Sequence, residues 1–205
     1  SECRPELPYT FKGDFYTASI DVHGYITSLV ETTTDRELVD PMVAPFGVVS
    51  MQMDYGDSWL NFEGPISGGS LESSLTQNVH DPLYRNLEGA LSNRGTFFPE
   101  TCASIEYCDE ERVVVEQECE ITFWRIRLHF ITYITFEKSE RRITYRTEFT
   151  PSGRHYRLRV AFPTTIEQGR RFYEIPFGIQ ERGAGEHVAQ NWVDYSEPDC
   201  GVALL

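Results

Sequence analysis

A two-residue alternation of apolar and polar side chains constrains this sequence more than any other feature. It runs through residues 124–130, 143–149 and 156–162. In the first of these segments, WRIRLHF, an aromatic or aliphatic residue occupies every second position, and Arg or His stands between them. Successive side chains of a β-strand point to opposite faces, so this period indicates strands with one buried and one polar face. Turn-forming residues between the segments, such as Pro151-Ser152-Gly153, predict antiparallel pairing.

The N-terminal half predicts further strands and one long irregular stretch. Residues 15–22 and 25–30 are strand-like and are joined at His23-Gly24, where Gly supplies the positive φ of a tight hairpin. Alternation returns at residues 49–54, and Gly, Ser, Asn and Pro then dominate residues 55–95, which predicts long loops. No segment shows the 3.6-residue period and the caps of a helix. We therefore predict an all-β fold, a large antiparallel β-sandwich.

The charge of the chain argues against one class of partner. The formal net charge is −14 and the pI is about 4.7, whereas proteins that bind nucleic acids present basic surfaces to the phosphates. The charge is uneven, because residues 120–171 carry a net charge of +6. Much of this positive charge alternates with apolar residues and predicts an Arg-bearing strand face, which is either solvated or docks on an acidic partner surface. The arginines concerned are Arg125, Arg127, Arg142, Arg146, Arg157 and Arg159.

The cysteines and the hydrophobic runs bear on the setting of the protein. Five cysteines without paired spacing do not indicate a disulfide framework, and no Asn-x-Ser/Thr sequence is present. Both observations favour a reducing, cytoplasmic location. No apolar run is long enough to span a membrane. We therefore expect neither nucleic acid nor membrane among the partners.

No motif in the sequence predicts a metal site. The five histidines form no HxH, HExxH or Cys/His pattern. The acidic segment from Asp54 to Trp59 lacks the full set of oxygen ligands that a calcium loop needs. One interpretation is a hairpin tip with solvated carboxylates. The other is a loop directed at a sugar, on which Trp59 stacks its flat apolar ring.

The C-terminal residues carry the most specific signal. Two strand-like runs, Phe172 to Gln180 and Trp192 to Leu205, flank a charged, Gly-containing loop that begins at Glu181. The sequences FYEIPFGIQERG, WVDYS and GVALL, in this order, resemble the end of the C-terminal β-domain of glycoside hydrolase family 38, the α-mannosidases. The hairpin FYTASIDVHGYITSLVETTTDRELVD near the N-terminus and the acidic segment DYGDSWLNFEGP resemble parts of the same domain.

This resemblance implies a fold and a place in a larger enzyme. Residues 1–205 are expected to form a single domain, a galactose mutarotase-like supersandwich, that is a fragment of an α-mannosidase. In the family, the zinc and the two catalytic carboxylates belong to upstream parts of the chain. The resemblance therefore implies that this fragment alone holds no metal and no catalytic residue and is inactive. The expected partners are the N-terminal catalytic domain of the parent chain and a mannose-containing oligosaccharide.

The resemblance also implies one substrate-binding residue. Arg182 falls on a motif that lies at the edge of the sugar pocket in the family. There a permanently charged donor can orient a hydroxyl group or keep an acid ionised. Glu181, Asp57 and Trp59 complete the candidate set. In the alternative interpretation, Arg182 is a surface residue that pairs with Glu181 or Glu186.

Two other functions stay open. The chain could be a free-standing carbohydrate-binding β-sandwich module. It could also be a mutarotase-like enzyme, which needs a convergent His/Glu acid–base pair that no sequence pattern indicates. The sequence encoded upstream of Ser1 would distinguish them, because a barrel with zinc-binding His and Asp residues is expected only for the α-mannosidase.

Overall fold

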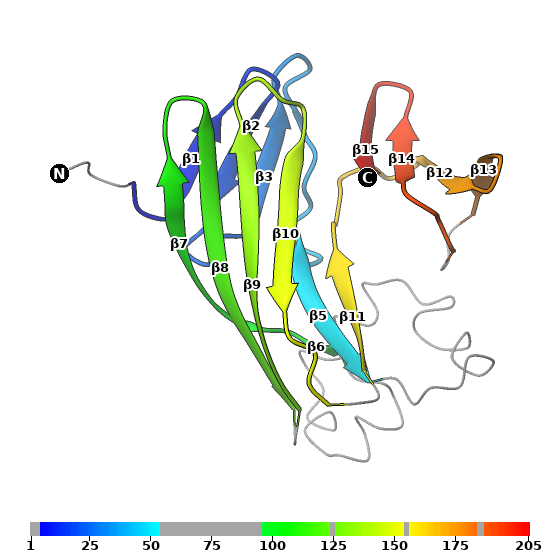
Figure 1. The fold of residues 1–205 in the computed structure, drawn as a ribbon. Coiled ribbons are helices and arrows are strands. Elements are labelled where there is room, and N and C mark those ends of the chain that lie inside the picture. Colours follow the sequence, from blue (N-terminus) through cyan, green and yellow to red (C-terminus); the bar gives the residue numbers. More distant parts are fainter. Residues whose placement is uncertain (1–4, 54–95, 124–125, 154–155, 184–186) are drawn as a thin grey trace.

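The described part of the chain is built from β-strands. The computed structural model describes residues 5–53, 96–123, 126–153, 156–183 and 187–205, and every regular element in these ranges is a strand. Within them the strands form four sheets, whose neighbouring strands are antiparallel (Figure 1). These ranges contain no helix that could cross a membrane. The predicted all-β antiparallel fold is confirmed, whereas Asp57 and Trp59 lie outside the described residues.

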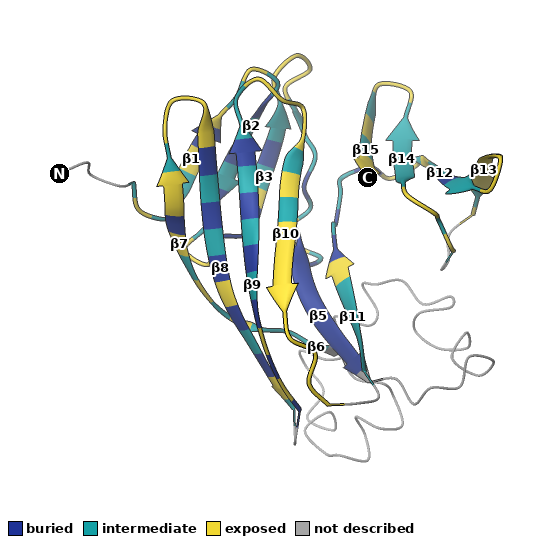
Figure 2. Ribbon diagram, viewed as in Figure 1, coloured by how far each residue is buried: buried dark blue, intermediate teal, exposed yellow. Residues whose placement is uncertain are grey.

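The largest sheet has the strand order β10-β9-β8-β7. Its strands are β7 (Glu100–Cys108), β8 (Arg112–Phe123), β9 (Ile126–Glu137) and β10 (Ile143–Phe149). The two central strands pair along their whole length, and buried and more exposed residues alternate along both of them (Figure 2). The alternation predicted for residues 126–130 is thus confirmed, and it gives this sheet one apolar face.

Two smaller sheets cover that apolar face. One has the order β1-β2-β3-β4, formed by Tyr9–Lys12, Tyr16–Ile20, Ile26–Glu31 and Arg36–Glu37. The other has the order β11-β5-β6, formed by Tyr156–Ala161, Val48–Met53 and Thr96–Phe97. Together they form the second layer of a sandwich (Figure 1).

Two of the three apolar clusters of the core follow this division. In the first cluster, Ile134 and Phe136 of β9 pack in one apolar group with Ile20 and Ile26 of the N-terminal sheet. In the second, Leu128 belongs to a group that includes residues of β5 and β8: Val49, Met51, Cys119 and Ile121. Each fully buried side chain of this size contributes roughly 1.5–3 kcal/mol relative to exposure. The long sheet therefore holds both smaller sheets in place.

The predicted hairpin at His23-Gly24 is present between β2 and β3. Gly24 has a φ of 78°, the positive value that the turn requires. One carboxylate oxygen of Asp21 accepts hydrogen bonds from the backbone N–H groups of His23 and Tyr25, each at 2.9 Å. Local turn chemistry thus sets the register of a strand pair whose apolar side faces the core.

The arginines do not form the single strand face that the sequence predicted. Arg127 and Arg146 lie on the more exposed side of β9 and β10. Arg157 and Arg159 instead belong to β11 in another sheet, where they pair in register with Gln52 and Ser50. Alternation determines the face within a strand but not the sheet that the strand joins, so the predicted common face is wrong. Arg125 lies outside the described residues.

The last sheet has the order β13-β12-β14-β15, formed by Gly178–Arg182, Arg170–Ile175, Val193–Glu197 and Cys200–Leu204. It corrects the sequence prediction twice. The run Phe172 to Gln180 is not one strand but a hairpin, and Trp192 to Leu205 is a second hairpin. Glu181 and Arg182 therefore lie in β13 rather than in a loop. The first turn was missed because Phe177, and not a glycine, has the positive φ of 68°.

Candidate functional site

The side chains of Glu181 and Arg182 lie on opposite faces of the C-terminal sheet. They are consecutive residues of β13, so their side chains point in opposite directions. Glu181 forms an ion pair with Arg170 through two hydrogen bonds, of 2.9 Å and 2.5 Å. The hydrogen bonds from the Arg170 guanidinium lower the pKa of Glu181 below its usual range. The interpretation in which Glu181 neutralises Arg182 is therefore wrong, while Glu186 lies outside the described residues.

Arg182 lies on the other face, where its side chain contacts an amide and an aromatic ring. Its Nε and Nη2 donate hydrogen bonds to Oε1 of Gln180, at 3.1 Å and 2.9 Å. Its guanidinium carbon lies 5.7 Å from the centre of the Tyr173 ring. The Tyr173 ring is buried and meets His187 edge-on, with the ring centres 5.2 Å apart. The arginine is thus positioned by polar and ring contacts that leave its charge without a carboxylate among them.

A second arginine lies directly across from it. Arg171 is the cross-strand partner of Arg182, and its guanidinium carbon lies 4.5 Å from the ring centre of Tyr195. Two like charges opposite each other repel, so an anionic or polar group placed between them would be favourable. Guanidinium donors beside aromatic rings suit sugar hydroxyls with ring C–H groups, or a carboxylate. We call Arg171, Tyr173, Gln180, Arg182, His187 and Tyr195 the arginine–tyrosine face.

Sequence reasoning found only Arg182 of this face. Four of the other residues follow from the cross-strand register of the β12–β13 and β12–β14 pairs, and His187 joins them through its ring contact with Tyr173. The sequence could have revealed the first pair if Pro176-Phe177 had been recognised as the turn, because counting outward from it pairs Arg171 with Arg182. Asp57 and Trp59 lie outside the described residues, so their predicted roles stay predictions.

A polar anchor holds the C-terminal sheet to the sandwich. One carboxylate oxygen of Glu197 lies 2.6 Å from Nη2 of Arg36, and the other accepts hydrogen bonds from the backbone N–H groups of Glu167 and Gln168. The Arg36 guanidinium, followed by the backbone donors, lowers the pKa of Glu197. The Tyr195 hydroxyl donates to the carbonyl oxygen of Ile166 at 2.8 Å. These contacts fix β14, and with it the arginine–tyrosine face.

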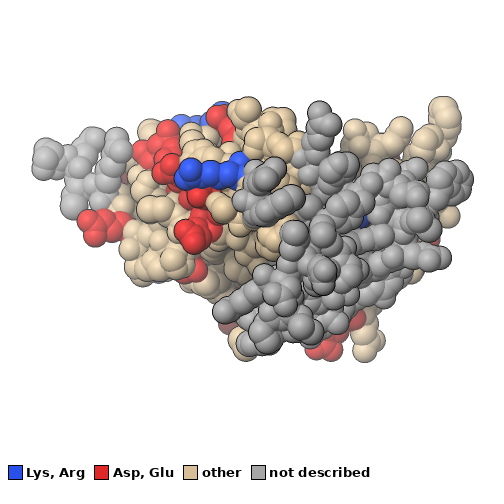
Figure 3. Space-filling view, turned by 90° about the horizontal axis from the view of Figure 1, so that it is seen from below, with Lys and Arg blue, Asp and Glu red and all other residues tan. Residues whose placement is uncertain are grey.

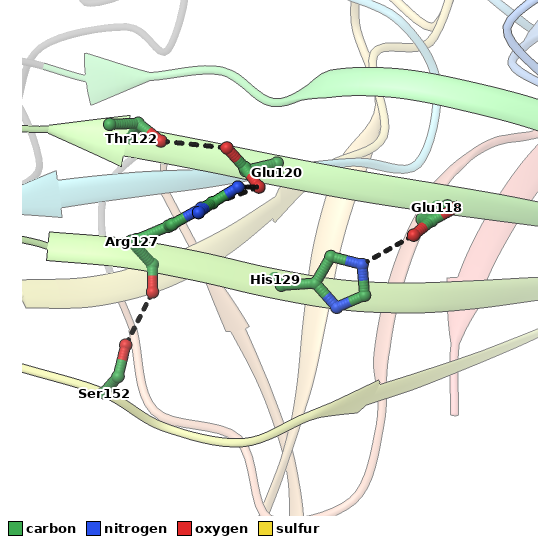
Figure 4. A network of polar contacts seen from close by, with 6 residues as sticks. All are labelled: Glu118, Glu120, Thr122, Arg127, His129 and Ser152. Atoms are coloured by element: carbon green, nitrogen blue, oxygen red, sulfur yellow. Dashed lines mark hydrogen bonds and ion pairs between the residues drawn. The ribbon is translucent and has the colours of Figure 1, made fainter.

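The exposed face of the large sheet carries a second polar cluster (Figure 4). Glu118 lies 2.9 Å from Nε2 of His129, and Glu120 accepts two hydrogen bonds from Arg127 at 2.9 Å and 2.7 Å. Arg127 lowers the pKa of Glu120. An open depression of about 400 Å³ adjoins the cluster and is lined by Glu100, Thr101, Cys102, Glu118, Cys119, Glu120 and His129. Glu118 pairs with His129 and Glu120 with Arg127, and no Phe, Tyr or Trp ring lines the depression, so it offers a sugar less than the arginine–tyrosine face does.

The described residues offer no ready metal centre. No group of three His, Cys, Asp or Glu side chains among them could hold a metal ion, and the four cysteines within the described ranges are free thiols. Figure 3 shows acidic side chains beside Lys and Arg side chains at the left of the view, and further acidic side chains at the lower edge. The candidate site therefore consists of donors and rings rather than of metal ligands.

Comparison with known protein families identifies the family of this chain. A protein-family model described as the C-terminal domain of glycosyl hydrolases family 38 matches residues 12–205. The chain belongs to this family. The resemblance that the C-terminal motifs carry is thereby confirmed. No curated protein sequence matches the chain.

Two solved structures share the fold. The first, an α-mannosidase from Enterococcus faecalis V583, superposes with a TM-score of 0.65 and 10% sequence identity, covering 97% of this chain and 23% of that chain. The second, a protein in the glycosyl hydrolase family 38 from Enterococcus faecalis, gives a TM-score of 0.63 and 11% identity, covering 94% and 23%. At such identities the likeness shows the fold alone. The family 38 chain described here spans about a quarter of the length of both structures.

Proposed function

We propose that this chain is the C-terminal β-domain of an α-mannosidase and that it contributes Arg182 to the edge of the sugar site. The parent enzyme would hydrolyse α-mannosidic bonds, and the domain would support a zinc-dependent catalytic domain. Membership of family 38 supports the parent enzyme. The zinc and the catalytic carboxylate pair of a glycosidase belong, in this proposal, to the upstream domain.

The arrangement of Arg182 is the observation that carries the proposal. Its guanidinium has no carboxylate among its described contacts and keeps further N–H donors beyond the two that Gln180 accepts. These donors could orient a sugar hydroxyl or hold a carboxylate of the catalytic domain in its ionised form. Arg182 would act as a positioning residue, because it prepares the geometry for groups that lie outside this chain.

Substituting Arg182→Ala in the full-length enzyme tests this role. Loss of one positioning contact is expected to cost about 1–3 kcal/mol of transition-state stabilisation, which lowers kcat/KM roughly 5- to 150-fold. Arg182→Lys should restore only part of the rate, because an ammonium group lacks the planar fork of donors. The kinetics are measured on a mannoside together with thermal stability.

Arg170→Ala provides the matched control. Arg170 lies on the same sheet but on the opposite face, where it pairs with Glu181. Its loss should leave kcat/KM unchanged. Equal kinetics of Arg182→Ala and the parent enzyme, in a stably folded variant, would reduce Arg182 to a surface residue.

A free-standing carbohydrate-binding module is the second candidate. It is favoured by the guanidinium groups of Arg171 and Arg182, which lie beside the rings of Tyr195 and Tyr173 and supply hydrogen-bond donors for sugar hydroxyls. Titration of the isolated chain with mannose oligosaccharides distinguishes the two. Saturable binding that Arg182→Ala abolishes would support a module, whereas the α-mannosidase proposal expects binding only in the full-length enzyme.

A further inference from the structure

The turn between β12 and β13 holds a phenylalanine in an unfavourable conformation. Ile175 pairs with Gly178, so Pro176 and Phe177 form the two-residue connection. Phe177 has a φ of 68°, a value that glycine adopts freely and that bulky side chains adopt only with strain. Proline followed by a residue with positive φ is the pattern of a type II turn, in which glycine normally occupies the place of Phe177.

The same side chain gains nothing from the chain that surrounds it. Phe177 is fully exposed, and Ile179, on the adjoining edge strand, is 64% exposed. Half of the large apolar side chains that are exposed in the described chain lie after residue 176, a region that holds far fewer than half of the described residues: they are Phe177, Ile179, Val188, Leu204 and Leu205. The backbone of this residue is strained and its ring is solvated, so burial of the ring against another apolar surface would stabilise it.

We propose that the β12–β13 tip, Phe177 with Ile179, is a docking element that inserts into an apolar pocket on another domain of the parent enzyme. The proposal rests on the proposed function in one respect, that a catalytic domain precedes this one in the same protein. The chain matches a family defined as a C-terminal domain, and it covers only 23% of the α-mannosidase structure that shares its fold. More than three quarters of such an enzyme is therefore available to cover the tip.

The position of the tip connects docking with the candidate site. Ile179 and Arg182 belong to the same edge strand, and Gln180, which orients Arg182, lies between them. Burial of Phe177 against a neighbouring domain would bring the start of β13 to the domain boundary, with Arg182 at the other end of the same short strand. A buried aromatic anchor surrounded by polar contacts is the usual core of such an interface. The docking element would thereby determine where the Arg182 guanidinium stands relative to the catalytic domain.

The substitution Phe177→Gly tests the proposal because it acts in opposite directions in the two contexts. In chain 1–205 it removes the strain of the positive φ, and we expect an unchanged Tm or a rise of about 1–4 °C. In the full-length enzyme it removes the anchor, and amide hydrogen exchange in β12 and β13 should accelerate at least tenfold. Phe177→Asn, which also tolerates this backbone conformation, should behave in the same way.

Met42→Ser is the control. Met42 is 91% exposed, but it lies in the connection between β4 and β5, outside the C-terminal sheet. It should change exchange at the tip in neither context. Unchanged exchange at the tip of the full-length Phe177→Gly enzyme would overturn the proposal. A Tm of chain 1–205 that rises with protein concentration, and that Phe177→Gly makes independent of concentration, would also overturn it, since that result would identify a second copy as the occupant. Neither readout depends on mannosidase activity, so failure of the proposed function remains distinguishable.

Discussion

The sandwich and the C-terminal sheet use the same kind of strand in different ways. In the sandwich, β8 and β9 bury every second side chain against two covering sheets, and Phe136 is 0% exposed. In the C-terminal sheet, four of the five residues of β13 are exposed (Figure 2). Polar contacts of Glu197 and Tyr195 join this sheet to the sandwich. The first region gains its stability from its own core. The second is anchored at β14 and presents its arginines, rings and hairpin tip.

This difference shows how one chain can combine a stable scaffold, the sandwich, with a sheet whose side chains are available for contacts with other groups. Burial on both layers fixes the register of the long strands, because a shift by one residue would turn their apolar side chains outward. The C-terminal sheet has little such burial, so its register depends on turns and on the ladder of backbone hydrogen bonds. Polar functional side chains can lie on such a sheet because they do not have to be buried in a core.

The largest expected contrast is between two phenylalanines. Phe136→Ala removes a fully buried ring from the first core cluster and should lower the free energy of unfolding by about 3–5 kcal/mol. Phe172→Ala, in the half-buried part of β12, should cost less than about 1.5 kcal/mol, because it removes mainly a contact with Arg170. Denaturant unfolding of both variants provides the measurement. Equal losses would contradict the division into two regions.

Two glycines give the next contrast. Gly24 has a positive φ, and a Cβ there would lie 2.9 Å from the Cβ of Ala103 and 3.0 Å from a methyl carbon of Val115. Gly24→Ala should therefore destabilise the sandwich by about 1–3 kcal/mol. Gly178→Ala should change stability by less than about 1 kcal/mol, because a Cβ there meets no atom within 4 Å. Thermal unfolding of the two variants decides whether the regions differ in packing.

Sequence reasoning succeeded where burial and local turn chemistry agree. The alternation of β9 and the Gly24 hairpin both follow from rules that act within a few residues. It failed at the Phe177 turn, because the residue with positive φ is not one that signals a turn. That single error concealed the pairing of Arg171 with Arg182 and placed Arg182 in a loop. Which sheet β11 joins could not be read either, since it depends on pairing with β5, more than a hundred residues earlier.

The smallest expected contrast concerns pH. Hydrogen bonds from Arg36 and from two backbone N–H groups lower the pKa of Glu197 in the folded protein. A depressed carboxyl pKa contributes stability above the unfolded value, and this contribution is lost as the pH falls through the folded value. The attachment of the C-terminal sheet should therefore weaken below the ordinary glutamate pKa of about 4.3.

Hydrogen exchange in β14 and β15, corrected for the intrinsic rate at each pH, measures this effect. Glu197→Gln should accelerate exchange there at neutral pH and remove the acid dependence. Exchange in β8 and β9 should change little in that variant. Acid-dependent exchange that persists in Glu197→Gln would show that another group controls the attachment.

Comparing hydrogen exchange in chain 1–205 with that in the full-length enzyme tests the central claim most directly. The claim is that the sandwich is stable by itself, whereas the C-terminal sheet is completed by the rest of the parent enzyme. We expect amides of β8 and β9 to be equally protected in both proteins. Amides of β12 and β13 should exchange much faster in chain 1–205 and become protected in the full-length enzyme. Equal protection of β12 and β13 in the two proteins would contradict the account.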